Sequence, residues 1–424
     1  MTGILNILDY KEASMDGTDW TEAFRQAVED IKKAQGGTLF VPAGEYRTRS
    51  IELTSNMTLY LCAGSELSFS DEIEKYEILD GEFEGIARPM YKPLIYMSHL
   101  QNVAIRGEGK INGNGRRWWE KIWDKSLVEA RPCLIYFEYC ENIKIENVYL
   151  TMSPVWTVHP LYSKNVVIHG VTIVNPADSP NTDGINPDSC QNVRISDCYI
   201  DVGDDCIAIK AGVEDTPMKR VCENITITNC NMIHGHGGVV IGSEMSGGVR
   251  NVVVSNCLFQ DTDRGIRLKT RRRRGGFMEQ LSFNNIIMDR VMCPFVFNMY
   301  YFGGKVGKEP WVSDRNPAPV DEGTPVIRDI NISNMTVLNA TSCAGVLSGL
   351  AEQYLENIRF SNCQITMSQD GEAELPAMMS GMDKMKGAGF YMRNAKGIVF
   401  DQVEVKNAIG AEIDMDESVD LARK

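Results

Sequence analysis

The sequence predicts an all-β protein, a right-handed parallel β-helix of roughly ten coils with a short N-terminal capping helix. Three observations lead to this prediction. A short pattern centred on asparagine returns along the chain, each copy precedes alternating apolar and polar residues, and four polar segments fall in phase with the repeat. A chain of 424 residues ordinarily predicts two or three domains, but a solenoid grows by adding coils. We therefore expect one domain over residues 1–424.

The N-terminal residues 1–69 are expected to form the cap and the first strands. After Asp16-Gly17-Thr18 comes a helical pattern that ends at Gly36-Gly37. Its apolar members are Trp20, Ala23, Phe24, Ala27, Val28 and Ile31. A helix ahead of the first coil would cover an end that is otherwise an unpaired sheet edge.

The regular coils are expected over residues 101–406. Their ten pattern centres are Asn102, Asn142, Asn165, Asn192, Asn224, Asn251, Gln280, Asp329, Asn357 and Gly397. The alternation that follows, as in Ile225-Thr-Ile-Thr-Asn-Cys230, is typical of a strand with one buried face. Asparagine suits the preceding turn because it tolerates left-handed geometry. Residues 70–93 and 300–325 interrupt the period and are expected to be projecting loops.

Composition excludes some classes of protein. The net charge of -14 argues against a nucleic-acid partner, because no large basic face is available for phosphates. No apolar run reaches the length of a membrane span and no signal peptide is visible, so we expect no membrane partner. The dense cationic run Arg271–Arg274 is either a solvated charge run or part of a binding pocket.

The twelve cysteines lack the spacing of a secreted disulfide framework. Four of them, Cys198, Cys230, Cys257 and Cys363, each fall six residues after a repeat asparagine. We expect them to be reduced, stacked in the core, and therefore typical of a cytoplasmic protein.

Four short polar segments can be laid over one another. They are 181–185, 203–207, 235–239 and 263–267, and in each a small residue precedes an apolar one: Gly184, Cys206, Gly238 and Gly265. Equivalent positions in neighbouring coils lie about 4.8 Å apart. The alignment thus predicts one groove that holds Asp183 beside Asp205, with His236, Arg267 and Lys269 further along.

These segments resemble the signature motifs of the polygalacturonase-type enzymes of glycoside hydrolase family 28. The matching motifs are Asn181-Thr-Asp183, Gly203-Asp-Asp205, Gly235-His-Gly237 and Arg267-Leu-Lys269. Their order and spacing agree over most of the chain, and they depart at Leu268, where the family often has isoleucine. The resemblance implies an inverting hydrolase in which Asp204 is the general acid, while Asp183 and Asp205 hold and deprotonate the water. His236 would help to set the proton of the acid, and Asn181 would orient its neighbours or the sugar.

Strand parity raises a difficulty at the acid pair. Ile207 and Ile209 should point inward, so an unbroken strand would bury Asp205 as well. The chain is therefore expected to bend or bulge at Asp205-Cys206. Arg267 and Lys269 should come out together, either to hold a substrate carboxylate or merely to bridge to the aspartates.

Other residues have a structural and a functional interpretation. His159 either lines a subsite or is a satisfied structural histidine, and Tyr300 and Tyr301 either stack on a sugar or pack in the core. Arg271 is a candidate for further uronate binding.

We expect an exo-acting, cytoplasmic galacturonosidase on oligogalacturonides that needs no metal or cofactor, and the sequence leaves a homo-oligomer open. The alternatives are a hydrolase of rhamnogalacturonan-type fragments, a β-helix polysaccharide lyase and a non-catalytic carbohydrate-binding β-helix.

Overall fold

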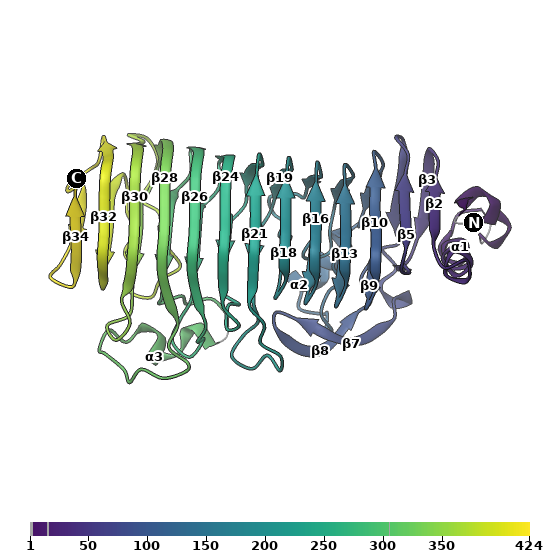
Figure 1. Ribbon diagram of the computed structural model, residues 1–424, viewed down its shortest axis with the longest axis horizontal. Helices are drawn as coiled ribbons and strands as arrows, with labels where there is room; N and C mark the ends of the chain where they lie inside the picture. Colours follow the sequence, from purple (N-terminus) through teal and green to yellow (C-terminus); the bar gives the residue numbers. More distant parts are fainter. Residues whose placement is uncertain (1–2, 15–16, 305) are drawn as a thin grey trace. The chain divides into compact units, whose positions relative to one another are not determined.

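The computed structural model describes residues 3–14, 17–304 and 306–424. Asp16, which precedes the predicted helix, and Lys305, within the second predicted loop, lie outside the described residues. The chain forms two compact units, residues 1–204 and 205–424, and each consists of stacked parallel strands (Figure 1). Helices in the described ranges are all too short or too polar to cross a membrane.

The capping helix is present in the first unit. α1 spans Thr21–Lys33 and buries the predicted apolar face of Ala23, Phe24, Ala27, Val28 and Ile31. It is followed by β2 (Gly37–Val41), which pairs with β5 (Met57–Leu61) in parallel. The prediction of an N-terminal helix before the first coils is confirmed, and Figure 1 shows α1 beside β2 and β3 (Gly44–Thr48).

Three ladders of parallel strands build the rest of the first unit. The longest continues from β5 through β10 (Gln101–Gly107), β13 (Glu141–Glu146), β16 (Lys164–His169) and β18 (Gln191–Ser196). The second follows β6 (Ser65–Phe69), β11 (Lys110–Asn112), β14 (Tyr149–Thr151), β17 (Thr172–Val174) and β19 (Tyr199–Val202). The third follows β4 (Ile51–Glu52), β9 (Ile95–Ser98), β12 (Ile135–Glu138) and β15 (Val158–Leu161).

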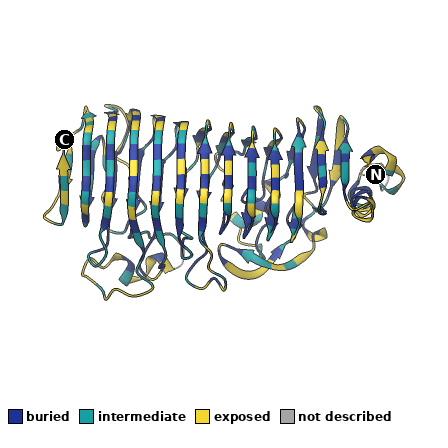
Figure 2. Ribbon diagram, viewed as in Figure 1, coloured by how far each residue is buried: buried dark blue, intermediate teal, exposed yellow. Residues whose placement is uncertain are grey.

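The second unit has two long ladders. One contains β21 (Cys222–Thr228), β22 (Asn231–His234), β24 (Val249–Gln260), β26 (Phe277–Asp289), β28 (Val326–Ala340), β30 (Leu355–Met367), β32 (Ala395–Lys406) and β34 (Val419–Arg423). The other contains β20 (Asp205–Ile209), β23 (Gly237–Ile241), β25 (Arg264–Lys269), β27 (Cys293–Asn298), β29 (Cys343–Ser348), β31 (Ala388–Arg393) and β33 (Ile413–Met415). Figure 2 shows buried and exposed residues alternating along the first of these ladders.

The asparagine turns behave as the repeat predicts. All ten pattern centres have positive φ, between 54° and 64°. Their amides also bond from coil to coil: Asn142 Nδ2 donates to Asn102 Oδ1 over 3.1 Å, and Asn192 Nδ2 donates to Asn165 Oδ1 over 3.0 Å. A second left-handed position, which the sequence reasoning missed, follows each centre five residues later, as at Asn147.

The two insertions are more ordered than predicted. Residues 70–93 contain an antiparallel hairpin, β7 (Ile78–Phe83) and β8 (Ile86–Tyr91), so the prediction of a loop is wrong there. Its turn has positive φ at Glu84 and Gly85. In the second insertion the short elements η3 (Val306–Lys308) and α3 (Pro310–Ser313) lie among turns. The helix α2 (Arg116–Trp123), whose Trp118 and Trp119 are fully buried, was not predicted from the sequence.

The stacked cysteines are confirmed as core residues. Cys198, Cys230, Cys257 and Cys363 are all buried, and all twelve cysteines, which lie in the described ranges, are free thiols. Burial raises the pKa of Cys363 to about 11, so its thiol stays protonated at neutral pH. These thiols therefore pack as small apolar groups.

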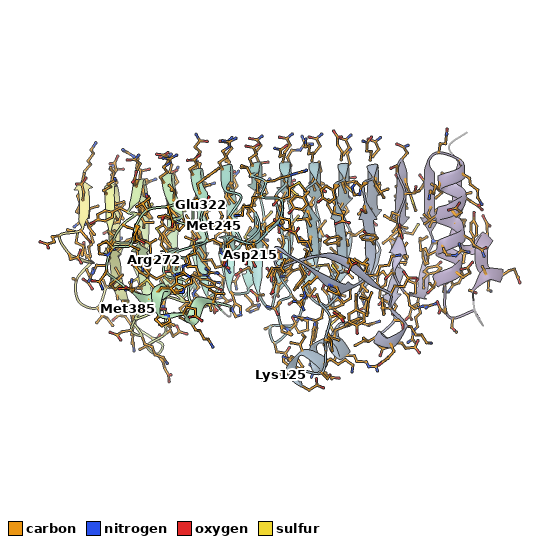
Figure 3. The ribbon with its side chains drawn as sticks, turned by 90° about the horizontal axis from the view of Figure 1, so that it is seen from below. Lys125, Asp215, Met245, Arg272, Glu322 and Met385 are labelled. Carbon is orange, nitrogen blue, oxygen red and sulfur yellow. The ribbon has the colours of Figure 1, made fainter. Side chains whose placement is uncertain are left out.

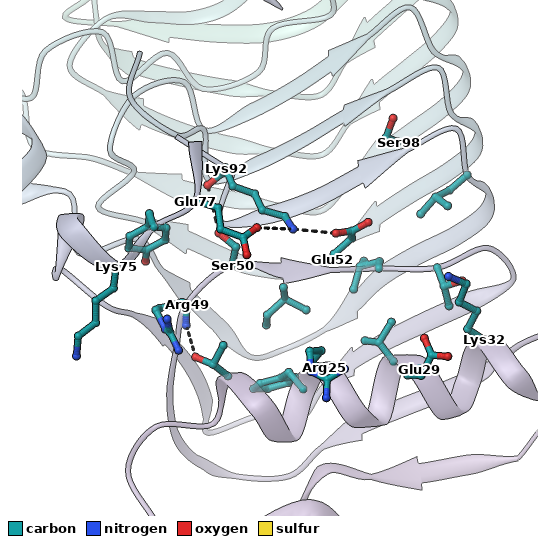
Figure 4. A pocket seen from close by; sticks show the side chains of 18 residues that line it. Arg25, Glu29, Lys32, Arg49, Ser50, Glu52, Lys75, Glu77, Lys92 and Ser98 are labelled. Carbon is teal, nitrogen blue, oxygen red and sulfur yellow. Dashed lines mark hydrogen bonds and ion pairs between the residues drawn. The ribbon is translucent and has the colours of Figure 1, made fainter. Parts of the chain in front are cut away.

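A cavity of about 560 Å³ lies in the first unit between α1 and the first strands (Figure 4). Phe24, Val28, Ile51 and Leu53 are among its apolar lining residues. Part of its charged rim is paired, because Lys92 Nζ lies 2.9 Å from Glu52 Oε2 and 3.4 Å from Glu77 Oε2.

Candidate active site

The predicted bend at Asp205-Cys206 is present. Asp205 reaches the side chains of Arg267 and Lys269, whereas Ile207 and Ile209 are fully buried in the core. Cys206 is also fully buried, and its Sγ lies 3.9 Å from the carbonyl oxygen of Ile233. Two successive side chains, those of Cys206 and Ile207, therefore point inward, whereas Asp205, directly before them, lies on the side of Arg267 and Lys269.

The same break recurs in the next two coils. Register pairs Asp205 with Gly237 and Val239 with Ile266, so Gly238 and Gly265 occupy the position of Cys206, as the alignment predicted. A Cβ on Gly238 would lie 2.8 Å from the Phe259 ring. A Cβ on Gly265 would lie 2.6 Å from Met288 Sδ. The residue at this position must be small because it faces the packed interior.

Asp205 is held by two cations. Its carboxylate lies 2.8 Å from Lys269 Nζ and 3.2 Å from Arg267 Nη1, and all three side chains are buried. Burial alone raises the pKa of Asp205, but the charges of Lys269 and Arg267 outweigh it and hold this pKa well below its usual range. Arg267 and Lys269 share one side of β25 as predicted, yet they lie under other residues and not on an open surface.

Tyr301 and Met378 lie against this cation pair. The Tyr301 ring centroid is 5.5 Å from Lys269 Nζ and 6.0 Å from the Arg267 guanidinium. Arg267 Nη2 is 3.1 Å from Met378 Sδ. Tyr301 is half-buried, in contrast to the two buried cations beside it.

Tyr300 does not lie on a sugar-binding surface. Its side chain is fully buried, and Arg315 lies 3.7 Å and Arg272 5.6 Å from its ring centroid. The prediction that Tyr300 stacks on a sugar is therefore wrong, because arginines already pack against its ring.

The arginine run is mostly structural. Arg271 Nη2 bonds to Glu214 Oε1 over 2.6 Å, and Arg274 Nη1 bonds to Glu214 Oε2 over 2.5 Å. Arg272, labelled in Figure 3, bonds to both carboxylate oxygens of Glu352. Arg272 also donates to the carbonyl oxygens of Trp311, Asp314 and Asn316. Arg271 is buried against Glu214, and its predicted contact with substrate stays a prediction.

His236 has a carboxylate partner that the sequence reasoning missed. Its Nδ1 lies 2.8 Å from Asp263 Oδ2, and both side chains are partly exposed. Arg264 Nη1 reaches the same Asp263 oxygen over 3.1 Å. Asp263 opens the fourth aligned segment, so its place in the alignment was a usable signal.

The first unit carries the other two aspartates. Asn186 Nδ2 donates to Asp183 Oδ2 over 3.1 Å, and Asp183 is buried. Asn181 Nδ2 lies 3.5 Å from Asp204 Oδ2, and Asp204 is half-buried. Asn181 has φ of 55°, the left-handed geometry that asparagine tolerates.

Arg131 is a second residue that the sequence reasoning missed. It is buried, and its Nη2 donates to Asn181 Oδ1 over 2.7 Å. Its Nη1 donates to the carbonyl oxygens of Pro154 and Pro180. Burial lowers the pKa of Arg131 to about 10, although nearby carboxylates, Asp183 and Asp204 among them, act in the opposite direction. No periodic signal marks Arg131 in the sequence.

His159 is enclosed, and its predicted contact with substrate is wrong. The ring is 1% exposed and packs edge-on against Trp156 and Tyr136. Its Nε2 lies 3.7 Å from Asp188 Oδ2 and makes no hydrogen bond within the described part of the chain. His159 is thus a buried structural residue, but within the described residues its Nε2 lacks the hydrogen bond that the prediction of a satisfied histidine included.

The hairpin β7–β8 contacts this aromatic region. Phe83 stacks on Trp156 with ring centroids 4.7 Å apart. The hydroxyl of Tyr162 lies 3.1 Å and 3.0 Å from the two carboxylate oxygens of Glu82. Burial, reinforced by the charge of Asp188, raises the pKa of Glu82 to about 7.

The parallel β-helix and these acidic, imidazole and cationic side chains are those of a polysaccharide-cleaving glycoside hydrolase. Sequence comparison supports this class and narrows it. The family model for glycosyl hydrolases family 28 matches residues 37–375. The chain therefore belongs to glycosyl hydrolases family 28.

Two similar proteins, both named as probable polygalacturonases, support the assignment to this family. A probable polygalacturonase of Vitis vinifera is 36% identical over 360 residues, which cover 82% of this chain and 71% of that protein. A probable polygalacturonase of Arabidopsis thaliana is 33% identical over 307 residues, 70% of this chain and 62% of that protein.

Solved structures show the same fold. A hyperthermoactive exopolygalacturonase from Thermotoga maritima has a TM-score of 0.75 and 29% identity, with 94% of this chain and 91% of that chain covered. A family 28 exopolygalacturonase from Yersinia enterocolitica has a TM-score of 0.79 at 20% identity, with 99% of this chain and 77% of that chain covered. The second likeness concerns the fold alone.

Proposed function

We propose that this glycoside hydrolase is an inverting galacturonosidase that releases galacturonate from the non-reducing end of oligogalacturonides. The observation that carries the choice of an acidic sugar is the cation pair Arg267 and Lys269 beside half-buried Tyr301. Cations next to an aromatic ring suit a sugar that bears a carboxylate. The polygalacturonases among the relatives support the same substrate class.

The three aspartates take different roles in this proposal. Asp205 is kept ionised by its cations, which suits a carboxylate that holds or deprotonates water. Asp183, which accepts from Asn186, shares that task. Asp204 follows Gly203 in the motif and is the general acid that protonates the leaving oxygen. Inversion then requires that the water attack the face of the sugar opposite to the leaving group.

Exo action is supported by the hairpin and by one relative. The hairpin β7–β8 is an ordered insertion, fixed by Phe83 on Trp156 and by Glu82 on Tyr162. Such an insertion is a candidate wall for one end of a binding groove. The Thermotoga maritima protein, 29% identical, is an exopolygalacturonase.

Digestion of trigalacturonate tests the three parts of the proposal separately. Chromatography should show monomer and dimer as the first products, and NMR should show the β anomer of the newly formed reducing end first. Absence of any product would refute galacturonide hydrolysis. Initial release of internal fragments from longer chains would refute exo action, and an initial α anomer would refute inversion.

A hydrolase acting on rhamnogalacturonan-type fragments is the nearest alternative. The same cation pair would bind the galacturonate unit, and only the neighbouring sugar would differ. Parallel assays on both fragment types would separate the two. A lyase would instead give an unsaturated product that absorbs in the ultraviolet.

The free thiols support a proposal on location. Twelve cysteines without a disulfide are typical of a reducing compartment, so we propose that the protein works in the cytoplasm on imported oligosaccharides. Cell fractionation with an antibody against the protein tests this, and recovery outside the cytoplasm would refute it.

A further inference from the structure

Asp263 and His236 come from two neighbouring turns of the second unit. His236 lies between β22 and β23, and Asp263 lies directly before β25. The backbone N–H of Asp263 donates to the carbonyl of Gly235 over 2.9 Å, so the two turns are joined next to the side-chain contact. The 2.8 Å approach of His236 Nδ1 to Asp263 Oδ2 is thus supported by a second bond.

Asp263 is itself held in place. Arg264 donates to Asp263 Oδ2, and its other nitrogens donate to the carbonyls of Leu375 and Pro376 over 2.7 Å and 3.0 Å. Arg264 is buried, so these bonds fix its position. The carboxylate of Asp263 is therefore tied through Arg264 to the segment that contains Met378, which contacts Arg267.

The protonation of the pair follows from its surroundings. Burial alone raises the pKa of Asp263, but the hydrogen bond of His236 and the charge of Arg264 outweigh it and lower this pKa below its usual value. An ionised carboxylate only accepts hydrogen bonds. The imidazole must then carry its proton on Nδ1, which leaves Nε2 as the nitrogen for other partners.

We propose that Asp263 is a positioning residue for His236, fixing the tautomer and the ring orientation that the reaction needs. This proposal rests on the proposed function, in which His236 helps to set the proton of the general acid. A carboxylate that orients a working imidazole through Nδ1 is a known physical arrangement, because it selects one tautomer and one ring angle. Asp263 itself has no assigned contact with the sugar.

A double-mutant cycle tests whether Asp263 acts through His236. The four proteins are wild type, Asp263→Asn, His236→Ala and the double variant. On trigalacturonate, Asp263→Asn should lower kcat about tenfold and change KM less than about twofold. Asp263→Glu should recover most of that loss. In the His236→Ala background, Asp263→Asn should have no further effect on kcat.

A matched control is available in the first unit. His169 Nδ1 lies 3.3 Å from Asp197 Oδ2 in another partly exposed pair. Asp197→Asn makes the same chemical change without a role in the site and should leave kcat unchanged. An equal loss from Asp263→Asn in both His236 backgrounds would overturn the proposal, because it would show a role independent of the imidazole.

Nitrogen-15 NMR gives a readout that does not need activity. The His236 ring signals, identified by their loss in His236→Ala, should show Nδ1 protonated in the wild type and a mixture of tautomers in Asp263→Asn. Unchanged ring signals would overturn the proposal even if activity fell. A wild type that shows the expected tautomer but releases no galacturonate would refute the proposed function alone.

Discussion

The two units stabilise buried carboxylates in opposite ways. In the first unit, Glu82 is held by the hydroxyl of Tyr162, and burial together with Asp188 raises its pKa to about 7. In the second unit, burial acts on Asp205 in the same direction, yet Lys269 and Arg267 outweigh it. The comparison shows that burial alone does not decide whether a carboxylate is charged, because the neighbouring charges set the balance.

The same contrast between the two units is found at other acidic residues. Burial raises the pKa of Glu244, but Lys210 and Lys269 outweigh it and bring this pKa to about 2. In the first unit, Asp183 and Asp204 each accept a hydrogen bond from an amide, that of Asn186 and that of Asn181 respectively. An amide carries no net charge, so its hydrogen bond favours the ionised carboxylate less strongly than a bond from a cation does.

The largest expected effect concerns Asp204. If its amide-supported carboxyl carries the transferred proton, Asp204→Asn should lower the rate of galacturonate release about a thousandfold. Initial rates on trigalacturonate measure this, and thermal unfolding checks that the half-buried substitution leaves the fold intact. A variant with more than a tenth of the wild-type rate would remove Asp204 from the role of acid.

Removing one of its two cations tests how strongly they stabilise the buried carboxylate of Asp205. Lys269→Met leaves Asp205 buried with one partner fewer, and we expect the free energy of unfolding to fall by about 3 kcal/mol. Urea unfolding at pH 7 measures the change. Lys269→Arg keeps the charge and serves as the control, so an equal loss in both variants would point to packing and not to charge.

A smaller effect is expected from changing Arg131, which holds the side chain of Asn181 by a hydrogen bond. Arg131→Lys keeps the charge but cannot reach Asn181 Oδ1 and the two proline carbonyls together. We expect kcat on trigalacturonate to fall about tenfold as Asn181 loses its orientation. Arg117→Lys, at an exposed ion pair with Glu74, is the matched control and should leave kcat as in the wild type.

The smallest expected effect concerns Glu82 and is seen in how the stability of the protein depends on pH. The folded pKa of Glu82, about 7, exceeds the ordinary value of 4.5, so the folded state binds a proton more tightly than the unfolded chain. The stability that Glu82 contributes is therefore full below pH 4.5 and is lost as the pH rises through 7.

Glu82→Gln removes this titration. The melting temperature of the variant relative to wild type should rise steadily between pH 4.5 and pH 7.5. Glu77→Gln, at a largely exposed carboxylate, should show no such trend. A constant difference for Glu82→Gln across this pH range would contradict the raised pKa.

Much of the fold was predictable because the repeat is encoded locally. A left-handed turn needs a residue that tolerates positive φ, and Asn, Gln, Asp or Gly fills all ten predicted positions. The second turn had a comparable signal in Asn147, Asn229 and their equivalents, five residues further on. The hairpin β7–β8 was missed because residues 70–93 interrupt the repeat and were therefore read as a loop, although Glu84-Gly85 marked its turn.

The site was predictable where the motif determines it and less so where long-range packing does. The bend at Cys206 followed from parity alone, because a carboxylate and an isoleucine cannot share the same inward side. Arg131 could not be found in this way, since it reaches Asn181 from fifty positions earlier in the chain. Tyr300 and Tyr301 are adjacent and chemically identical, and the sequence could not show that Tyr300 is fully buried whereas Tyr301 is only partly buried.

The small residue at the strand break has a consequence for catalysis. Gly238 has little room for a larger side chain, because a Cβ there would lie 2.8 Å from the Phe259 ring inside the coil. A single added methyl group at Gly238 would require the Phe259 ring or the backbone to move, and His236 and Gly237 directly precede Gly238 in the chain. The working face of the enzyme is thus shaped by atoms that no substrate ever meets, and variants meant to tune activity should also be sought on the inner side of the wall.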